Sequence, residues 1–256
     1  MNKFLFSLVT GVFIGGTAGY LGSLMVSKKM ALVAGPLGHL TLPGIALALL
    51  YGFDVSLGAL PFVVLGALLI WFLRIKTKLP EEALTAIIFS VGVAFSFLLL
   101  PSKELETALV GDISQVGWEE TVSSVIICLI VFLVLRRIYY RIILTLVSED
   151  LARVEGIEVD KYNFIYFSCI AVIVALGVKI VGGMLTAALV AIPACTSRNL
   201  TKGLDRYSSL ALVMGGVSSL SGIFLANVVS YPAGPLIILC SAFFFMISSF
   251  LRQRDE

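Results

Sequence analysis

The chain is poor in charged side chains and contains a single histidine. The low share of charged residues already indicates which class of protein it is. Charged residues make up 13% of its 256 residues, whereas 59% are hydrophobic and the mean hydropathy is +1.05. Soluble domains carry about 25% charged and about 45–50% apolar residues. A water-soluble fold of this length has too little interior to bury so much apolar surface, so the composition indicates a membrane protein.

Several catalytic and binding motifs are also missing. No G-x-x-x-x-G-K-[ST] run is present, so the chain has no P-loop of its own for ATP hydrolysis. One histidine excludes an H-E-x-x-H zinc protease site, and no G-x-S-x-G run occurs. Gly111-Asp112 resembles the G-D of intramembrane aspartyl proteases, but it lies in a polar loop without a second intramembrane aspartate. These absences favour a transport protein over an intramembrane enzyme.

Dense basic runs and paired cysteines are absent as well. The net charge is only +2, so nucleic acid is not an expected partner. The cysteines form no C-x-x-C pair and all lie inside apolar stretches, which is typical of small hydrophobic side chains in helices. They are Cys128, Cys169, Cys195 and Cys240.

Nine apolar stretches approach the length of about 20 residues that a helix needs to cross the hydrocarbon core. The first runs from Phe4 past Leu24 without an A-x-A site, so we expect it to be retained as a transmembrane helix. The fold class is therefore an all-α, polytopic bundle, with residues 1–256 forming one transmembrane domain. The expected spans are 4–26, 31–52, 56–73, 82–101, 121–136, 163–179, 182–197, 207–230 and 233–251.

Lysine and arginine orient these spans. With the N-terminus outside and the C-terminus in the cytoplasm, 15 of the 18 basic residues fall on the inner side, as the positive-inside rule requires. The longest outer segment, 102–120, is acidic. Such a segment can form a vestibule that concentrates cations, with Glu104, Glu106 and Asp112 among its acids, although the acids of an ordinary solvated loop fit the same pattern.

His39 is the candidate functional residue. It lies ten residues beyond Lys29, about 15 Å along a helix and near the middle of a core of roughly 30 Å. An ionisable residue at this depth is a functional candidate, and interrupted helices at the midplane are where transporters bind substrate. The residues expected to break the helix are Gly35, Pro36, Gly38, Pro43 and Gly44, and the candidate partners in binding a metal ion are Met184, Cys195 and Asn227.

The segment 148–162, SEDLARVEGIEVDKY, is the most charged stretch of the chain. Ser148 followed by two acids predicts a helix N-terminus, and Gly156 predicts its end after about two turns. Such a short cytoplasmic helix can dock into a groove on a soluble partner, although a plain solvated connector fits the composition too.

Four segments together resemble the ABC-3 family of metal-importer permeases, in order and from about residue 20 to 250. They are KKMALVAGPLGHLTLPGIALAL, SEDLARVEGI, VGGMLTAALVAIPACTSRNL and SYPAGPLIILCSAFFFMIS. The resemblance implies a fold similar to that of the vitamin B12 importer permeases and a homodimer with one translocation path. It also implies two cytoplasmic P-loop ATPase subunits, an extracytoplasmic metal-binding protein and no permanently bound cofactor. The coupling residues would be Glu149, Asp150, Leu151, Ala152, Arg153, Glu155 and Gly156.

One position departs from the family pattern. The family places an aspartate four residues before the histidine, and here that position is Gly35. A site without a carboxylate suits a softer ion, so zinc is expected slightly ahead of manganese. The expected protein is a permease of a prokaryotic plasma membrane. Alternatives are an importer of a metal chelate or small organic nutrient, and an autonomous secondary transporter or channel.

Overall fold

The computed structural model describes residues 2–53, 55–99, 113 and 116–251, and this part of the chain is helical throughout. The first half holds α1 (Asn2–Ser27), η1 (Ala31–Val33), α2 (Ala34–His39), α3 (Thr41–Tyr51), α4 (Val55–Thr77) and α5 (Glu81–Leu99). The second half holds α7 (Trp118–Val147), α8 (Glu149–Val154), α9 (Val159–Val181), η3 (Gly183–Leu185), α10 (Thr186–Leu200), α11 (Leu204–Val229) and α12 (Ala233–Leu251).

Seven helices in the described part of the chain are long and apolar enough to cross a membrane, namely α1, α4, α5, α7, α9, α11 and α12. Two of the nine expected spans are not among these long helices. The interruption of 31–52 was predicted around His39, whereas that of 182–197 was not. The expected span 31–52 is divided into η1, α2 and α3, and the expected span 182–197 into η3 and the 15-residue α10. Glycines and prolines occur around the first interruption, and Gly182 and Gly183 lie at the second, whereas Pro193 lies inside α10.

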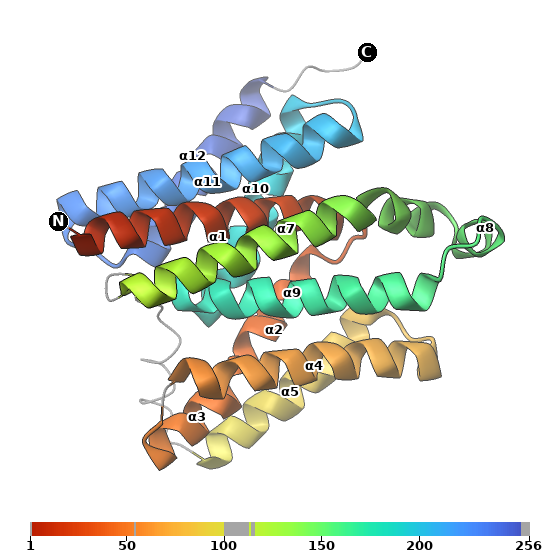
Figure 1. The fold of residues 1–256 in the computed structure, drawn as a ribbon, viewed down its shortest axis with the longest axis horizontal. Coiled ribbons are helices and arrows are strands. Elements are labelled where there is room, and N and C mark those ends of the chain that lie inside the picture. Colours follow the sequence, from red (N-terminus) through yellow and green to blue (C-terminus); the bar gives the residue numbers. More distant parts are fainter. Residues whose placement is uncertain (1, 54, 100–112, 114–115, 252–256) are drawn as a thin grey trace.

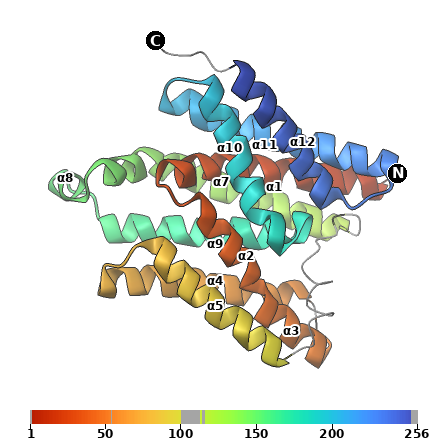
Figure 2. The same ribbon diagram turned by 180° about the vertical axis from the view of Figure 1, so that it is seen from behind.

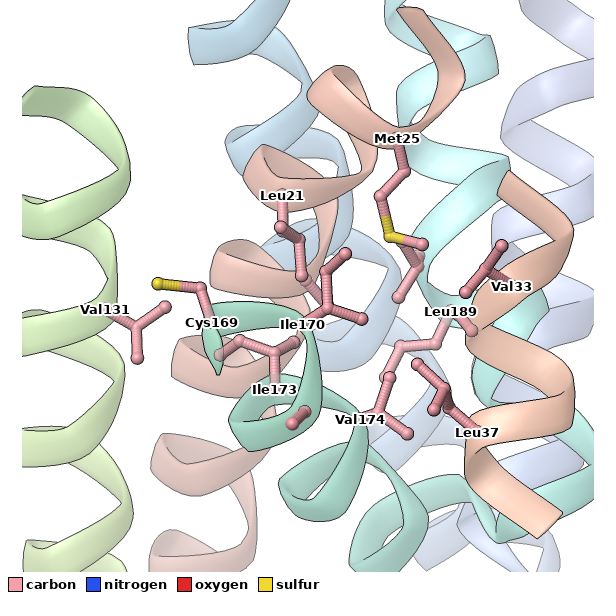
Figure 3. Close-up of a cluster of buried hydrophobic side chains, with 14 of the residues drawn as sticks. Leu21, Met25, Val33, Leu37, Val131, Cys169, Ile170, Ile173, Val174 and Leu189 are labelled. Atoms are coloured by element: carbon pink, nitrogen blue, oxygen red, sulfur yellow. The ribbon is translucent and has the colours of Figure 1, made fainter. Parts of the chain in front are cut away.

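Helix α9 runs through the hydrophobic core. Figure 3 shows Cys169, Ile170, Ile173 and Val174 of α9 among side chains from α1, α7, α10 and the short helices η1 and α2. Ile170 and Val174 are fully buried, and Cys169 packs beside Val131 of α7. Cys169 thus behaves as a small hydrophobic side chain, as its apolar context predicts.

Small residues let the helices approach closely. The stripe Gly11, Gly15 and Gly19 of α1 lies against α11, whereas Gly222 of α11 faces Ile237 of α12. Helix association in lipid depends on such close packing, because lipid chains are as apolar as the side chains. The glycines of α1 therefore join α1 to α11, and Gly222 joins α11 to α12.

The bundle has two different faces. In Figure 1 the helices α1, α7, α9 and α11 are foremost, and α8 projects from one end of the molecule. Figure 2 shows the opposite side, where α2, α5, α10 and α12 are foremost. The interrupted segments α2 and α10 thus lie on the same face, and they contact each other.

Candidate functional site

The second apolar segment is interrupted directly after His39. Helix α2 ends at His39, Leu40 lies between the two helices, and α3 begins at Thr41. Pro36 and Pro43 each occupy the third position of a short helix, where a backbone N–H has no helical partner in any case. The Thr41 hydroxyl donates to the carbonyl of Gly38 at 2.7 Å, so the interruption keeps its backbone partly paired.

A second interrupted segment meets the first. A Cβ built on Gly38 would lie 2.7 Å from the carbonyl oxygen of Gly183, so α2 and η3 are in backbone contact. Gly182 has φ +86°, and the Thr186 hydroxyl donates to its carbonyl at 2.7 Å. Paired, glycine-interrupted segments that meet inside a bundle are the geometry of a transporter binding site. The sequence indicated only the first of them, although Gly182-Gly183 was an available signal.

His39 is half-buried beside this junction. Its ring lies 5.5 Å from the ring of Phe89 on α5, with 53° between the planes. Helix α2 also packs against α9 and α10, so His39 stands where the first interrupted segment lies between α5 and the second. The aromatic neighbour was not foreseen, because no local pattern links residues 39 and 89.

The glycines around His39 serve close contact more than helix breaking. A Cβ on Gly44 would lie 2.0 Å from the carbonyl oxygen of Gly58, which draws α3 against α4. A Cβ on Gly35 would lie 3.3 Å from the Cβ of Ala187, so this position faces α10. At the position where the family pattern has an aspartate, Gly35 therefore packs against the methyl group of Ala187.

The structure separates two of the three proposed metal partners, Cys195 and Asn227, from each other. Ser197, two residues beyond Cys195, donates to the carbonyl of Tyr207 at the start of α11. Asn227 is exposed in the last turn of α11, about 30 Å along that helix from Tyr207. Cys195 and Asn227 thus lie near opposite ends of the bundle and cannot bind one ion together.

Met184 belongs to η3, and η3 contacts α2. The side chain of Met184 is not among those that the structure describes. Within the described residues, no three histidine, cysteine, aspartate or glutamate side chains are close enough to hold a metal ion. The predicted vestibule acids Glu104, Glu106 and Asp112 also lie outside the described residues.

The charged segment 148–162 forms the predicted short helix. The Ser148 hydroxyl accepts a hydrogen bond from the N–H of Leu151 at 3.2 Å, which caps the start of α8. At its end, the N–H of Ile157 donates to the carbonyl of Ala152, and Gly156 has φ +76°. This is a Schellman ending, for which glycine is favoured. Ala152 is buried, whereas Glu149, Asp150, Leu151, Arg153, Glu155 and Gly156 are exposed.

Arg74 joins three helices at the same end of the bundle as α8. From the last turn of α4 it contacts Glu81 of α5, Nε to Oε1 2.8 Å, and it also pairs with Glu149 of α8. The three-residue turn 78–80 between α4 and α5 brings Arg74 close to Glu81, and this signal is present in the sequence. The pairing of Arg74 with Glu149 depends on the tertiary fold, because α8 is far from α4 in the sequence.

Lys28 adds a cation to this end. Its Nζ donates to Asn163 Oδ1 at 3.0 Å and lies 4.9 Å from the ring centre of Tyr166. Burial lowers the pKa of Lys28, and the nearby Glu81 carboxylate opposes that change. At this end of the bundle α4, α5 and α8 are thus joined by ion pairs, and Lys28 after α1 is joined to α9 by a hydrogen bond.

The chain is similar to known proteins over nearly its whole length. The model of the ABC 3 transport family matches residues 1–252. The chain is 30% identical over 260 residues to the high-affinity zinc uptake system membrane protein ZnuB of Haemophilus influenzae, covering 99% of this chain and 100% of that protein. It is 26% identical over 254 residues to the manganese import system permease protein ScaB of Streptococcus gordonii, covering 98% and 91% of the two chains.

Solved structures share the fold. The PsaBC complex from Streptococcus pneumoniae with Fab has a TM-score of 0.84 at 24% identity, covering 99% of this chain and 93% of that chain. An inward-facing conformation of a putative metal-chelate type ABC transporter has a TM-score of 0.79 at 18% identity, covering 96% and 85%.

Proposed function

The chain belongs to the ABC 3 transport family, and we propose that it is the membrane-spanning permease subunit of an importer for zinc or manganese ions. The relatives named above are a zinc uptake membrane protein and a manganese import permease, which supports a divalent metal as cargo. The permease provides the path through the bilayer and does not itself hydrolyse ATP. A cytoplasmic P-loop ATPase and an extracytoplasmic metal-binding protein complete the system.

The observation that carries this proposal is the junction of the two interrupted segments beside His39. An imidazole there offers one ligand to a passing divalent ion, and interrupted helices at this depth are where transporters place further ligands. Because Gly35 supplies no carboxylate, the path lacks the oxygen ligand that manganese prefers. Zinc is therefore the favoured cargo.

A second copy of the chain completes the path. Helix α5 exposes a stripe of small residues, Ala86, Ser90 and Ala94, on the molecular face that also carries α2 and α12. Small residues at this spacing favour close packing of helices in lipid. A homodimer around this face would enclose His39 from both subunits in one path.

The orientation follows from the charged end of the bundle. Lys28, Arg74 and Arg153 lie towards α8, so this end faces the cytoplasm of a bacterial inner membrane and the N-terminus lies outside. The exposed α8 then meets the ATPase, with Leu151 and Val154 as its apolar contacts.

Replacing His39 tests the site. In proteoliposomes that contain the permease with its ATPase, we expect His39→Ala to lower zinc uptake at least about ten-fold, the usual effect of removing a group that supports metal binding. Asn227→Ala is the control, because Asn227 is exposed at the far end of α11 and should leave uptake unchanged.

Two outcomes would count against the proposal in different ways. Unchanged zinc uptake in His39→Ala would exclude His39 from the path while leaving family membership intact. Uptake of a metal chelate by the unaltered complex, with no uptake of free zinc or manganese, would exclude the bare ion as cargo.

A further inference from the structure

A crevice separates α7 from α11 on the face of the molecule opposite α2 and α5. Both helices pack against α1, but in the described part of the chain they hardly touch each other. Figure 1 shows α1 lying between them. The crevice encloses about 550 Å³, with Tyr20 of α1 among its lining residues. Its walls include polar side chains, which is unusual for helices that face lipid.

One hydrogen bond sets the register of the two walls. The Tyr140 hydroxyl of α7 donates to the Asp205 carboxylate in the first turn of α11. The helices run in opposite directions, so one turn further from this end Arg136 stands opposite Ser209, and both line the crevice. Each step of four residues is about 6 Å.

The next turn is apolar. Phe132 of α7 and Val213 of α11 line the crevice there. Exposed apolar side chains continue both walls towards the middle of the bundle, including Leu129 of α7 and Val217 of α11. The crevice therefore presents three layers in order: a carboxylate at the end, a guanidinium with a hydroxyl, and an apolar channel.

The two charges in the crevice do not neutralise each other. Among the described residues, neither Arg136 nor Asp205 takes part in a salt bridge. The Asp205 carboxylate accepts the Tyr140 hydroxyl and keeps further lone pairs, and the guanidinium keeps its donors. A ligand that carries both an anionic and an ammonium group, one turn apart, would complement both walls.

A phospholipid presents its groups in this order. Its amine lies outermost, its phosphate comes next, and its acyl chains run towards the middle of the membrane. The start of α11 lies towards the α8 end of the bundle, so Asp205 is level with the head groups and Arg136 lies one turn deeper. This match holds whichever side of the membrane that end faces.

We propose that the crevice binds one zwitterionic aminophospholipid of the phosphatidylethanolamine class, with its phosphate at Arg136 and Ser209 and its ammonium group at Asp205. An anionic lipid such as phosphatidylglycerol brings no cation to the carboxylate. The quaternary ammonium of phosphatidylcholine has no N–H to donate. The site thus distinguishes head groups, and it does not depend on which ion the protein carries.

Native mass spectrometry of the purified full-length permease tests the proposal, with titrations of the three lipids. We expect phosphatidylethanolamine to bind at concentrations about ten-fold lower than the other two, as one additional charge-assisted hydrogen bond predicts. Asp205→Asn should abolish the preference, and Arg136→Ala should weaken the binding of all three lipids, because each carries the phosphate that Arg136 binds. Arg137→Ala is the matched control, because Arg137 is the next residue on α7 and does not line the crevice.

Ser209→Trp is a second test that keeps both charges. It fills the crevice from an exposed position, so it should displace the lipid while the melting temperature in detergent stays unchanged. Equal binding of phosphatidylglycerol, retained preference in Asp205→Asn, or unchanged lipid binding in Arg136→Ala would overturn the proposal. Competition by phosphoethanolamine without acyl chains at the same concentration would overturn the lipid assignment in favour of a soluble ligand.

Discussion

The absence of a side chain at Gly215 allows α11 to pack closely against α1. A Cβ on Gly215 of α11 would lie 2.1 Å from the carbonyl oxygen of Gly15 on α1, and backbone atoms cannot give way as a flexible side chain can. Gly216, the next residue, has its nearest such neighbour at 3.6 Å, an ordinary contact distance. Adjacent glycines in one helix therefore have different roles, which their residue type does not reveal.

This difference predicts opposite effects of two alanine substitutions. Gly215→Ala should separate α1 from α11 and lower the free energy of unfolding by about 1–3 kcal/mol, the usual cost of overpacking. Gly216→Ala should leave stability unchanged or raise it slightly, because alanine favours a helix over glycine. Thermal unfolding of both variants in the same detergent measures the difference, and identical melting temperatures would contradict the packing argument.

At the scale of helices, Arg74 links the exposed α8 to the helix beside His39. It pairs with Glu149 of α8 and Glu81 of α5, and Phe89 lies two turns further along α5 against His39. A displacement of α8 would therefore be carried to α5 through one side chain. Lysine cannot fully replace this arginine, because it lacks the fork that reaches two carboxylates.

Arg74→Ala should uncouple ATP hydrolysis from transport in the permease–ATPase complex. We expect hydrolysis to continue while zinc uptake falls at least about ten-fold, because Glu81 then loses its charged partner and α5 its link to α8. The measurement is the number of ATP molecules hydrolysed per ion taken up, in proteoliposomes.

Lys76→Ala is the matched control for Arg74. Lys76 lies on the same turn of α4 but interacts with the Phe72 ring, 4.8 Å from its centre, and reaches neither carboxylate. Its ratio of hydrolysis to uptake should equal that of the unaltered protein. If hydrolysis and uptake fell in proportion in Arg74→Ala, Arg74 would be structural and no link between α8 and α5.

At the scale of the whole molecule, the two faces of the bundle have different neighbours. Helices α5 and α12 have the smallest buried share among the seven long helices, 17% and 22%, and they share a face with the interrupted segments. A single copy leaves that face open, which an ion path does not permit. The opposite face carries the α7–α11 crevice and is suited to lipid.

Photo-crosslinking distinguishes the two faces. A benzophenone side chain at Val91 of α5 should give a covalent dimer of the permease, because Val91 is 66% exposed on the proposed dimer face. The same probe at Leu133 of α7, which is 62% exposed, should crosslink to lipid and yield monomer. Dimer bands from Leu133 but not from Val91 would place the interface on the wrong face and contradict the proposed path.

Particular residues show how far prediction from the sequence reaches. The Ser148 cap and the Gly156 turn were predicted correctly, because capping depends on neighbours within a few residues. The grouping of Cys195 and Asn227 with His39 was not supported, because position in a sequence says nothing of which end of a bundle a residue reaches.

The sequence by itself determined the membrane class, the helical fold and the interruption around His39. Membrane insertion, helix formation and helix interruption depend on composition, charge distribution and the placement of glycine and proline along the chain. They can therefore be predicted without knowledge of tertiary contacts. Only the tertiary structure decided that Gly38 meets Gly183, that Arg74 joins α5 to α8, and that Arg136 and Asp205 line one crevice. These pairs are far apart in the chain, and helix packing alone brings them together.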